Sequence, residues 1–245
     1  MKKYGLIGLP LVHSFSKNYF TTKFEKEGIN ACYDLFELQD IDEFLLLKET
    51  DGLCGLNVTI PYKEKILPFM DELDDTAAGI GAVNVIKFIR EDGSLRLKGF
   101  NSDVFGFECS ISPFLKPHHK KALILGTGGA SKAIEYVLRK RGIETTFVSR
   151  TPKTGMLAYS QLNQQLISDN LVIINASPVG TFPHSNECPD IPYQFLTPRH
   201  ILFDVVYNPS ETIFLKKGRE HGAIGLNGEA MLIGQAEASW DIWNK

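Results

Sequence analysis

The sequence predicts an α/β protein of two domains, and two observations carry this prediction. Along residues 3–100, short apolar runs alternate with helical patterns, and strand–helix alternation is typical of a parallel or mixed sheet. After residue 120, a buried apolar run leads into a glycine-rich turn and then into a helical pattern. This order of elements favours a Rossmann-like domain with a parallel sheet.

The first half predicts strands that alternate with helices. Apolar runs rich in β-branched and aromatic residues indicate strands, and apolar residues three or four apart indicate helices. Asp92-Gly93 between two apolar runs signals a hairpin. The expected strands are residues 4–9, 31–38, 52–59, 79–89 and 95–100, and the expected helices are residues 17–27 and 41–48.

The second half begins after a connection that contains Pro113 and Pro117. It has the same alternation of patterns, with a glycine run after its first strand. The expected strands are residues 121–125, 145–149, 171–175 and 201–206, and the expected helices are residues 132–141, 211–221 and 229–243.

The composition is that of an ordinary globular protein and argues against several classes of function. The 245 residues are 43% hydrophobic and 22% charged. A formal net charge of −3 gives no electrostatic case for binding nucleic acid or an anionic membrane. The apolar runs are far shorter than a membrane span. Gly8 and Pro10 interrupt the N-terminal run, which indicates a first strand rather than a signal peptide.

The cysteines and histidines do not have the spacing of a metal site. Cys32, Cys54, Cys109 and Cys188 lie far apart, without a Cys-x-x-Cys pair. This scatter fits reduced thiols in a cytoplasmic protein better than a disulfide framework or a zinc site. We therefore expect a cytoplasmic protein without a metal ion.

Residues 57–63 are the most informative stretch of the first half. Alternation puts Asn57 and Thr59 on one face of an extended segment. Pro61 suits the first turn of a helix, so Lys63 is expected two residues into that helix. A lysine there opposes the helix dipole, which indicates a role other than local stability. The alternative is a strand end followed by a solvated lysine.

The glycine run is expected to hold the pyrophosphate of a dinucleotide. Glycines between a strand and a helix allow a tight turn, and they let backbone N–H groups approach phosphate at the positive end of the helix. The third position of the fingerprint is Ser131, which is small enough for close packing. The alternative is a glycine-rich turn in a sheet that binds no ligand. The loop residues are Gly126, Thr127, Gly128, Gly129 and Ala130.

The end of the next strand predicts NADP(H) rather than NAD. An NAD site usually has Asp or Glu there, which holds the ribose 2′-hydroxyl. This chain has Ser149, Arg150 and Thr151 instead. A carboxylate would repel a 2′-phosphate, whereas Arg150 can stack on the adenine and clasp the phosphate.

Short motifs occur along nearly the whole chain, at residues 13–16, 57–63, 81–84, 99–103, 126–130, 149–151, 175–180, 204–209 and 231–236. Together they resemble the motifs of the shikimate dehydrogenase family. The resemblance implies reduction of 3-dehydroshikimate to shikimate with NADPH, in the chorismate and aromatic amino-acid pathway. It also implies a small-molecule substrate and no nucleic-acid or membrane partner, and we expect a monomer or homodimer.

The resemblance also implies a domain division. Residues 1–102 and 226–245 would form a discontinuous substrate-binding catalytic domain, and residues 103–225 a Rossmann NADP-binding domain. The active site would lie in the cleft between them. The chain looks short around residues 104–120 and 152–170, which suggests trimmed helices in the cofactor domain.

Three departures from the family are mild. Where this chain has Ser149, the family usually has Asn, and where it has Ser102 and Ser177, the family usually has Thr. Each replacement keeps a hydrogen-bonding group. The departures therefore bear on how tightly NADP is held and not on the chemistry.

By the same resemblance, Lys63 and Asp103 are the catalytic pair. An ammonium beside a carbonyl can stabilise and protonate the oxygen that becomes an alcohol. Asp103 could orient Lys63 and also hold a ring hydroxyl. The alternative is a surface ion pair of little consequence.

The other candidate residues also come from the resemblance. Ser14 and Ser16, expected to point the same way from an extended stretch, resemble a carboxylate clamp, although Ser16 could instead cap the following helix. For the others, the alternative is an ordinary polar or packing role in a turn or helix. They are Thr59, Asn84 and Gln235 for the ring hydroxyls, Tyr207 for the substrate pocket, Val205 and Gly228 for the nicotinamide, and Asp75 for the cofactor side.

Two rival functions remain at this stage. One is a quinate/shikimate dehydrogenase of broader specificity, and Arg150 argues against a version of it that prefers NAD. The other is a non-catalytic NADP-binding homologue. Lys63 and Asp103 together argue against the homologue, because a sensor needs no acid–base pair.

Overall fold

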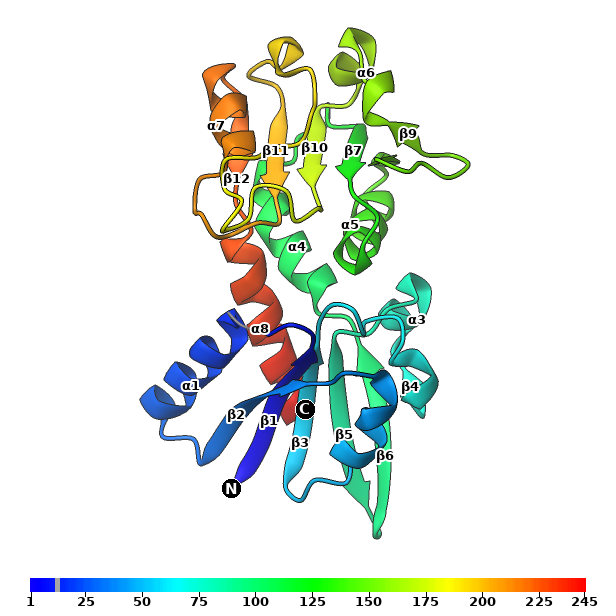
Figure 1. Cartoon of the computed structure of the whole chain (residues 1–245), viewed down its shortest axis with the longest axis vertical. Helices are drawn as coiled ribbons and strands as arrows, with labels where there is room; N and C mark the ends of the chain where they lie inside the picture. The colour runs from blue at the N-terminus through cyan, green and yellow to red at the C-terminus, as the bar shows by residue number, and fades with distance from the viewer. Residues whose placement is uncertain (12–13) are drawn as a thin grey trace. The chain divides into compact units, whose positions relative to one another are not determined.

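The structure is a computed structural model that describes residues 1–11 and 14–245 (Figure 1). Contacts divide the chain into two compact units. Unit 1 is Met1–Phe105 with Gly234–Lys245, and unit 2 is Gly106–Ile233. The boundaries predicted from the sequence, after residues 102 and 225, lie a few residues before those of the units. The roles of the two domains stay predictions.

Unit 1 contains a six-stranded mixed sheet, in line with the parallel or mixed sheet that the sequence predicts, and its first three strands are parallel. β1 lies between β2 and β3 and pairs in parallel with both. β5 is antiparallel to β3 and β6, and the short β4 is parallel to β6. In sheet order the strands are β2 (Ala31–Glu37), β1 (Lys2–Gly8), β3 (Leu53–Val58), β5 (Val85–Glu91), β6 (Ser94–Phe100) and β4 (Glu72–Leu73).

The predicted hairpin is confirmed, but its first strand is shorter than expected. Asp92 and Gly93 both have positive φ, 50° and 77°, which matches the type I′ turn that suits the twist of two antiparallel strands. The strand expected from residue 79 begins only at β5, because the helix α3 (Asp75–Ile80) continues to residue 80 and residues 81–84 form neither helix nor strand. Asp74 caps that helix by accepting from the Ala77 N–H.

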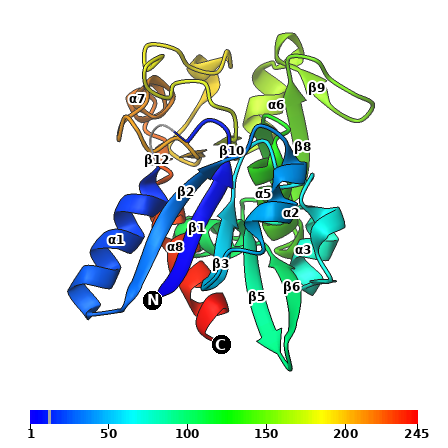
Figure 2. The same cartoon turned by 60° about the horizontal axis from the view of Figure 1, so that its bottom comes forward.

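Helices cover both faces of this sheet (Figure 2). Successive side chains of a strand point to opposite faces. Tyr4 of β1 packs with Phe20 and Phe24 of α1 and with Trp243 of α8, whereas Ile7 packs with Phe44 of α2. The predicted helix over residues 41–48 is split into a 3₁₀ turn and one α-turn. The elements are α1 (Phe15–Glu27), η1 (Ile41–Glu43), α2 (Phe44–Leu47), η2 (Leu67–Phe69) and α8 (Glu229–Asn244).

Unit 2 has a Rossmann-like fold, as predicted. All pairs in its sheet are parallel. Numbered along the unit, the strands lie in the order third, second, first, fourth, fifth, sixth, which is the order of doubly wound dinucleotide-binding sheets. From edge to edge they are β9 (Leu157–Ala158), β8 (Glu144–Ser149), β7 (Lys121–Leu125), β10 (Val172–Asn175), β11 (Ile201–Asp204) and β12 (Ile224–Leu226).

The helices of unit 2 are mostly short. The predicted helices over residues 132–141 and 211–221 correspond to α5 and α7, and α5 starts three residues earlier than expected, directly after Gly128. No helix among the described residues of the chain is long and apolar enough to cross a membrane. The helices are α4 (Asp103–Ile111), η3 (Ser112–Phe114), α5 (Gly129–Lys140), η4 (Tyr159–Gln161), α6 (Gln164–Asp169), η5 (Tyr193–Phe195) and α7 (Ile213–Glu220).

A buried histidine joins segments of unit 2. The His200 side chain is fully buried. Its Nδ1 accepts from the Thr197 backbone N–H at 3.0 Å, because a backbone N–H can only donate. Its Nε2 lies 3.0 Å from the Ile167 carbonyl oxygen. These partners require the neutral tautomer with the proton on Nε2. Burial lowers the pKa of His200, and its hydrogen bonds to backbone carbonyls partly oppose that shift.

This arrangement predicts a pH-dependent cost for His200→Gln. At low pH the unfolded chain binds a proton at this histidine while the folded chain does not, so the stability that His200 provides falls as the pH drops below about 6.5. The loss of unfolding free energy in the variant should therefore shrink from about pH 8 to about pH 5, by at most about 1.4 kcal/mol per pH unit. Urea unfolding of both proteins across this range measures it. Exposed His221→Gln is the control, and a difference for His200→Gln that stays constant or grows at low pH would contradict the prediction.

Candidate active site

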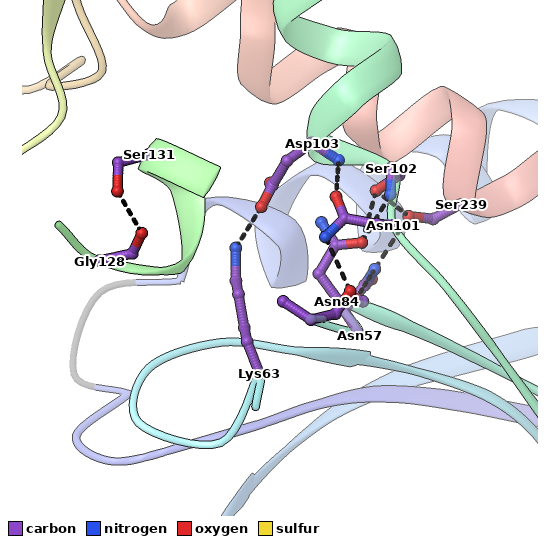
Figure 3. A network of polar contacts seen from close by, with 10 residues as sticks. Asn57, Lys63, Asn84, Asn101, Ser102, Asp103, Gly128, Ser131 and Ser239 are labelled. Carbon is purple, nitrogen blue, oxygen red and sulfur yellow. Dashed lines mark hydrogen bonds and ion pairs between the residues drawn. The ribbon is translucent and has the colours of Figure 1, made fainter. Parts of the chain in front are cut away.

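A buried ion pair lies at one end of the polar network of unit 1, next to Asn101 (Figure 3). Lys63 Nζ is 2.5 Å from Asp103 Oδ2, and the two side chains are only 13% and 2% exposed. Asp103 is the first residue of α4, where the helix dipole stabilises a carboxylate. The pair is therefore not a solvated surface contact.

Lys63 lies in a turn, and the helix predicted from Pro61 does not form. In a helix, the Lys63 carbonyl would accept from the Leu67 N–H. It accepts instead from the Val83 N–H at 2.8 Å, while the Leu67 N–H bonds the Glu64 carbonyl at 3.3 Å. A tertiary hydrogen bond thus replaces the helical one, and it ties the backbone of Lys63 to the segment before β5.

Asp103 is held from the other side by Asn101. The Asn101 side chain accepts from the Asp103 N–H at 3.1 Å and donates to the Ala82 carbonyl at 2.9 Å. Asn101 is itself buried. The segment before α4 is therefore fastened to the segment that follows α3.

Asn84 is buried in the same network with a defined orientation. Its Oδ1 lies 2.6 Å from the Ser102 backbone nitrogen, which can only donate. The amide oxygen of Asn84 must therefore face Ser102, and its NH₂ group points away from it. Among the described residues, this NH₂ group has no hydrogen-bond acceptor, so its two donors remain for an oxygen of a ligand.

Thr59 and Gln235 lie in unit 1 as well, both half-buried. Thr59 directly follows β3, where its N–H donates to the Ile7 carbonyl at 2.9 Å. Gln235 lies in α8, and its carbonyl accepts from the Ser239 hydroxyl at 2.7 Å. Asp75, predicted for the cofactor side, is an exposed residue in the first turn of α3.

Ser14 and Ser16 do not share an extended stretch, because Ser14 has extended backbone whereas Ser16 lies in α1, and Ser16 is not the helix cap. Because α1 begins at Phe15, earlier than predicted, Ser14 becomes the N-cap and accepts from the Lys17 N–H at 3.2 Å. Ser16 lies inside the first turn. Burial raises the pKa of the Tyr33 phenol, and a hydrogen bond with Ser16 opposes that shift. His13 of the same motif lies outside the described residues.

The glycine loop of unit 2 joins β7 to α5. Gly126 has φ of 115°, and a Cβ there would lie 2.9 Å from the Ala176 carbonyl oxygen, so only glycine fits. Gly128 is the N-cap of α5, and no side chain caps this helix. A Cβ built at Gly128 meets no atom within 4 Å. Backbone donors at Gly129 and Ala130 beside open space fit a pyrophosphate.

The residues predicted to select NADP lie at the C-terminal end of the neighbouring strand. β8 pairs with β7, and the Gly126 N–H bonds the Val148 carbonyl at 2.9 Å. Ser149 Oγ accepts from the Thr151 N–H at 3.2 Å, and Arg150 between them is exposed. No acidic residue occurs from Ser149 to Lys153, which fits a 2′-phosphate and not a bare ribose hydroxyl.

Val205 and Gly228, distant in sequence, are adjacent in unit 2. The Gly228 N–H donates to the Val206 carbonyl at 3.1 Å, and a Cβ at Gly228 would lie 2.2 Å from the Val205 carbonyl oxygen. Glycine at this position is therefore what lets the two segments meet. Tyr207, half-buried, follows in the same segment after β11.

No separate role was predicted for the buried Asp204, which links the end of β10 to the segment after β11. Asp204 accepts from the Asn175 side chain at 2.9 Å, from the Val206 N–H at 3.0 Å and from the Thr212 hydroxyl at 2.6 Å. Burial raises the pKa of Asp204 to about 6, and these hydrogen bonds oppose the shift. The sequence feature that could have pointed to Asp204 is that Asn175 and Asp204 are the last residues of two neighbouring strands.

A glycine-loop Rossmann unit, joined in one chain to an α/β unit with a buried lysine–aspartate pair, is typical of dinucleotide-dependent oxidoreductases. The comparisons with known proteins agree. The family model for the shikimate dehydrogenase substrate binding domain matches residues 6–86. The shikimate dehydrogenase (NADP(+)) of Methanosphaera stadtmanae is 33% identical over 98% of this chain and 90% of its own length.

Solved structures give the same result over the full length. A crystal structure of a shikimate dehydrogenase in complex with NADP⁺ is 30% identical, with a TM-score of 0.86 over 99% of this chain and 90% of that one. The shikimate 5-dehydrogenase of Thermus thermophilus, in complex with NADP(H) and shikimate, is 28% identical, with a TM-score of 0.85 over 99% and 93%. The chain belongs to the shikimate dehydrogenase family.

The contact between Gly228 and Val205 predicts the effect of Gly228→Ala. The added methyl group collides with a backbone carbonyl, which cannot rotate away, so the segment at Val205 must move. We expect the free energy of unfolding to fall by about 1–3 kcal/mol and the KM for NADPH to rise. Gly225→Ala is the control, because its Cβ lies 3.3 Å from the flexible end of Arg219. An unchanged melting temperature and KM for Gly228→Ala would refute this prediction.

Proposed function

We propose that this chain catalyses the reversible, NADPH-dependent reduction of 3-dehydroshikimate to shikimate. The observation that carries the proposal is the buried contact of 2.5 Å between Lys63 and Asp103. Membership of the family supports it, as does the Thermus thermophilus relative that was crystallised with NADP(H) and shikimate. The four unpaired cysteines support a site of action in the cytoplasm. We expect a monomer or homodimer there.

Lys63 would supply the proton of the reaction. NADPH, when bound, supplies the hydride to the carbonyl carbon. The Lys63 ammonium has three N–H groups and directs one to Asp103, which leaves two for the carbonyl oxygen of the substrate. It stabilises the charge that develops on this oxygen and then protonates it, which gives the alcohol. In the reverse direction, neutral Lys63 accepts the proton.

Asp103 would serve as the partner that positions Lys63. Its Oδ2 accepts a hydrogen bond from the Lys63 ammonium, and its Oδ1 can accept one from a ring hydroxyl of the substrate. Because Asn101 fixes the Asp103 backbone and Val83 fixes the Lys63 backbone, neither charge has to reorganise during the reaction.

The polyhydroxylated substrate would be bound by donors of unit 1. The NH₂ group of Asn84 points away from Ser102 and can donate to a ring hydroxyl, and Thr59 and Gln235 are further ring contacts. Ser14 accepts from the Lys17 N–H with a lone pair, so its own hydroxyl hydrogen is available to the substrate carboxylate. Ser16 is the second proposed contact of that carboxylate.

NADP(H) would be held by unit 2. The uncapped start of α5, at Gly126, Thr127, Gly128, Gly129 and Ala130, fits the pyrophosphate. The remaining contacts, in order along the chain, are Ser149, Arg150 and Thr151 for the 2′-phosphate, Val205 and Gly228 for the nicotinamide, and Tyr207 for the substrate pocket.

The direct test is an absorbance assay at the NADPH band with shikimate and NADP⁺. We expect NADPH to form, and to form faster than with quinate or with NAD⁺. Folded protein that binds NADP⁺ but oxidises neither shikimate nor quinate would identify a non-catalytic homologue. Equal turnover of the two acids would indicate a quinate/shikimate dehydrogenase of broader specificity.

Lys63→Ala should lower kcat by roughly 10²–10⁴-fold, which is the usual contribution of a positioned acid–base group. The affinity for NADPH should change much less, because Lys63 is not among the cofactor contacts. Steady-state kinetics and NADPH titration measure the two effects. Lys65→Ala, an exposed lysine two residues further on, is the control. A variant that keeps most of its turnover would remove Lys63 from proton transfer, and an effect on substrate KM alone would make it a binding group.

Arg150→Asp should raise the KM for NADPH far more than the KM for NADH. The new carboxylate repels a 2′-phosphate, which NADH lacks. Kinetics with both cofactors give the ratio directly. Lys140→Asp, the same charge change at the exposed end of α5, is the control. If both KM values rise equally, Arg150 does not recognise the phosphate.

A further inference from the structure

Ser239 of α8 is a fully buried serine with three polar partners, and no role was predicted for it. Its hydroxyl donates to the Gln235 carbonyl, with an oxygen–oxygen distance of 2.7 Å. The Asn57 side-chain nitrogen donates to Ser239 Oγ at 2.9 Å. The Ser102 hydroxyl oxygen lies 3.3 Å from Ser239 Oγ (Figure 3). All four residues belong to unit 1.

A count of hydrogens gives the direction of these bonds. A serine hydroxyl has one hydrogen and two lone pairs. Since the Ser239 hydrogen goes to the Gln235 carbonyl, both lone pairs of Ser239 can accept, one from Asn57 and one from Ser102. The single hydroxyl hydrogen of Ser102 is then shared between Ser239 Oγ and Asn84 Oδ1, each 3.3 Å away.

Asn57 is saturated by protein groups and connects Ser239 to the strands. Its Oδ1 accepts from the Tyr33 hydroxyl at 2.8 Å. Its two amide hydrogens go to Ser239 Oγ and to the Asn84 carbonyl, the latter at 3.3 Å. Asn57 therefore has no donor left for a substrate. It acts within the protein, as a link between β2, β3, the segment just before β5, and α8.

These bonds reach Asn84 along two routes that meet at Ser239. One route runs through Ser102 to the Asn84 side chain, and the other runs through Asn57 to the Asn84 carbonyl. The same serine also bonds the carbonyl of Gln235. Asn84 and Gln235 are both proposed ring contacts, so one hydroxyl joins two parts of the proposed substrate site.

We propose that Ser239 is a positioning residue that fixes the substrate-binding amide of Asn84. The proposal rests on the proposed function, and it assigns Ser239 no contact with substrate or cofactor. Removal of the hydroxyl leaves one hydrogen of the Asn57 amide without an acceptor in a buried site, and it leaves the Ser102 hydroxyl with Asn84 Oδ1 as its acceptor. The Ser102 N–H still sets which way the Asn84 amide faces, but Asn84 loses the support that reaches it from α8 through Asn57 and Ser102. Binding of the substrate therefore weakens, while the hydride and proton steps keep their groups.

The test is the KM for shikimate of Ser239→Ala, measured beside kcat and the KM for NADP⁺. We expect a rise of about tenfold in the KM for shikimate, the usual effect of a lost neutral hydrogen bond. The KM for NADP⁺ should stay within about twofold. Ser110→Ala is the matched control, because Ser110 makes the same kind of bond to a helix carbonyl, at 2.9 Å, outside this network.

A double-mutant cycle separates positioning from mere packing. If Ser239 acts through Asn84, Ser239→Ala should raise the KM for shikimate much less in an Asn84→Ala background. Ser239→Cys, close in size but a poor acceptor, should give an intermediate KM at a nearly native melting temperature, and it serves if the alanine variant does not fold. A normal KM for shikimate in Ser239→Ala and Ser239→Cys, or equal effects in both backgrounds, would overturn the proposal.

Assay of the wild-type protein under the same conditions separates the test of Ser239 from the test of the proposed function. Wild-type protein that oxidises no shikimate contradicts the proposed function. Active wild-type protein with an unaffected Ser239→Ala variant contradicts only the positioning role.

Discussion

The burial of one ammonium beside one carboxylate is the constraint on which the rest of unit 1 depends. A buried charge is costly unless it is paired, and removal of either partner leaves the other uncompensated. Lys63 and Asp103 can therefore coexist only if the backbone holds both ends in register. The bond from Val83 to Lys63 does this at one end, and Asn101 does it at the other. The two loops that flank β5 and β6 thus meet at the pair.

Around the pair, the directions of hydrogen bonds matter as much as their number. Because a backbone N–H of Ser102 holds the Asn84 amide by its oxygen, the donors of Asn84 must point away from Ser102. A satisfied buried network is rigid and specifies one arrangement. In unit 2, Asp204 has the corresponding role, since its carboxylate accepts from the last residue of β10 and from two residues that follow β11.

Local signals in the sequence predicted much of the fold. The apolar runs of β7, β10 and β11, the Asp92-Gly93 turn and the glycine loop before α5 were all recognised, because each depends on residues close together in the chain. The two-residue strands β4 and β9 are too short to show a periodic pattern. The helix expected at Lys63 does not form, because the Lys63 carbonyl accepts from a residue far along the chain. The start of α1 was predicted too late, because Ser14 and not Ser16 caps the helix. No local pattern could reveal Ser239, whose partner Asn57 lies 182 residues away.

The position of Trp243 in the chain bears on the order in which the two units can fold. Its indole N–H bonds the Ile86 carbonyl at 3.1 Å, and its ring packs on Tyr4 in the core of unit 1. During synthesis, every residue of unit 2 therefore leaves the ribosome before unit 1 receives its last aromatic side chain. Unit 2 can therefore form its core first, whereas the core of unit 1 is complete only after the last turn of α8 has been synthesised.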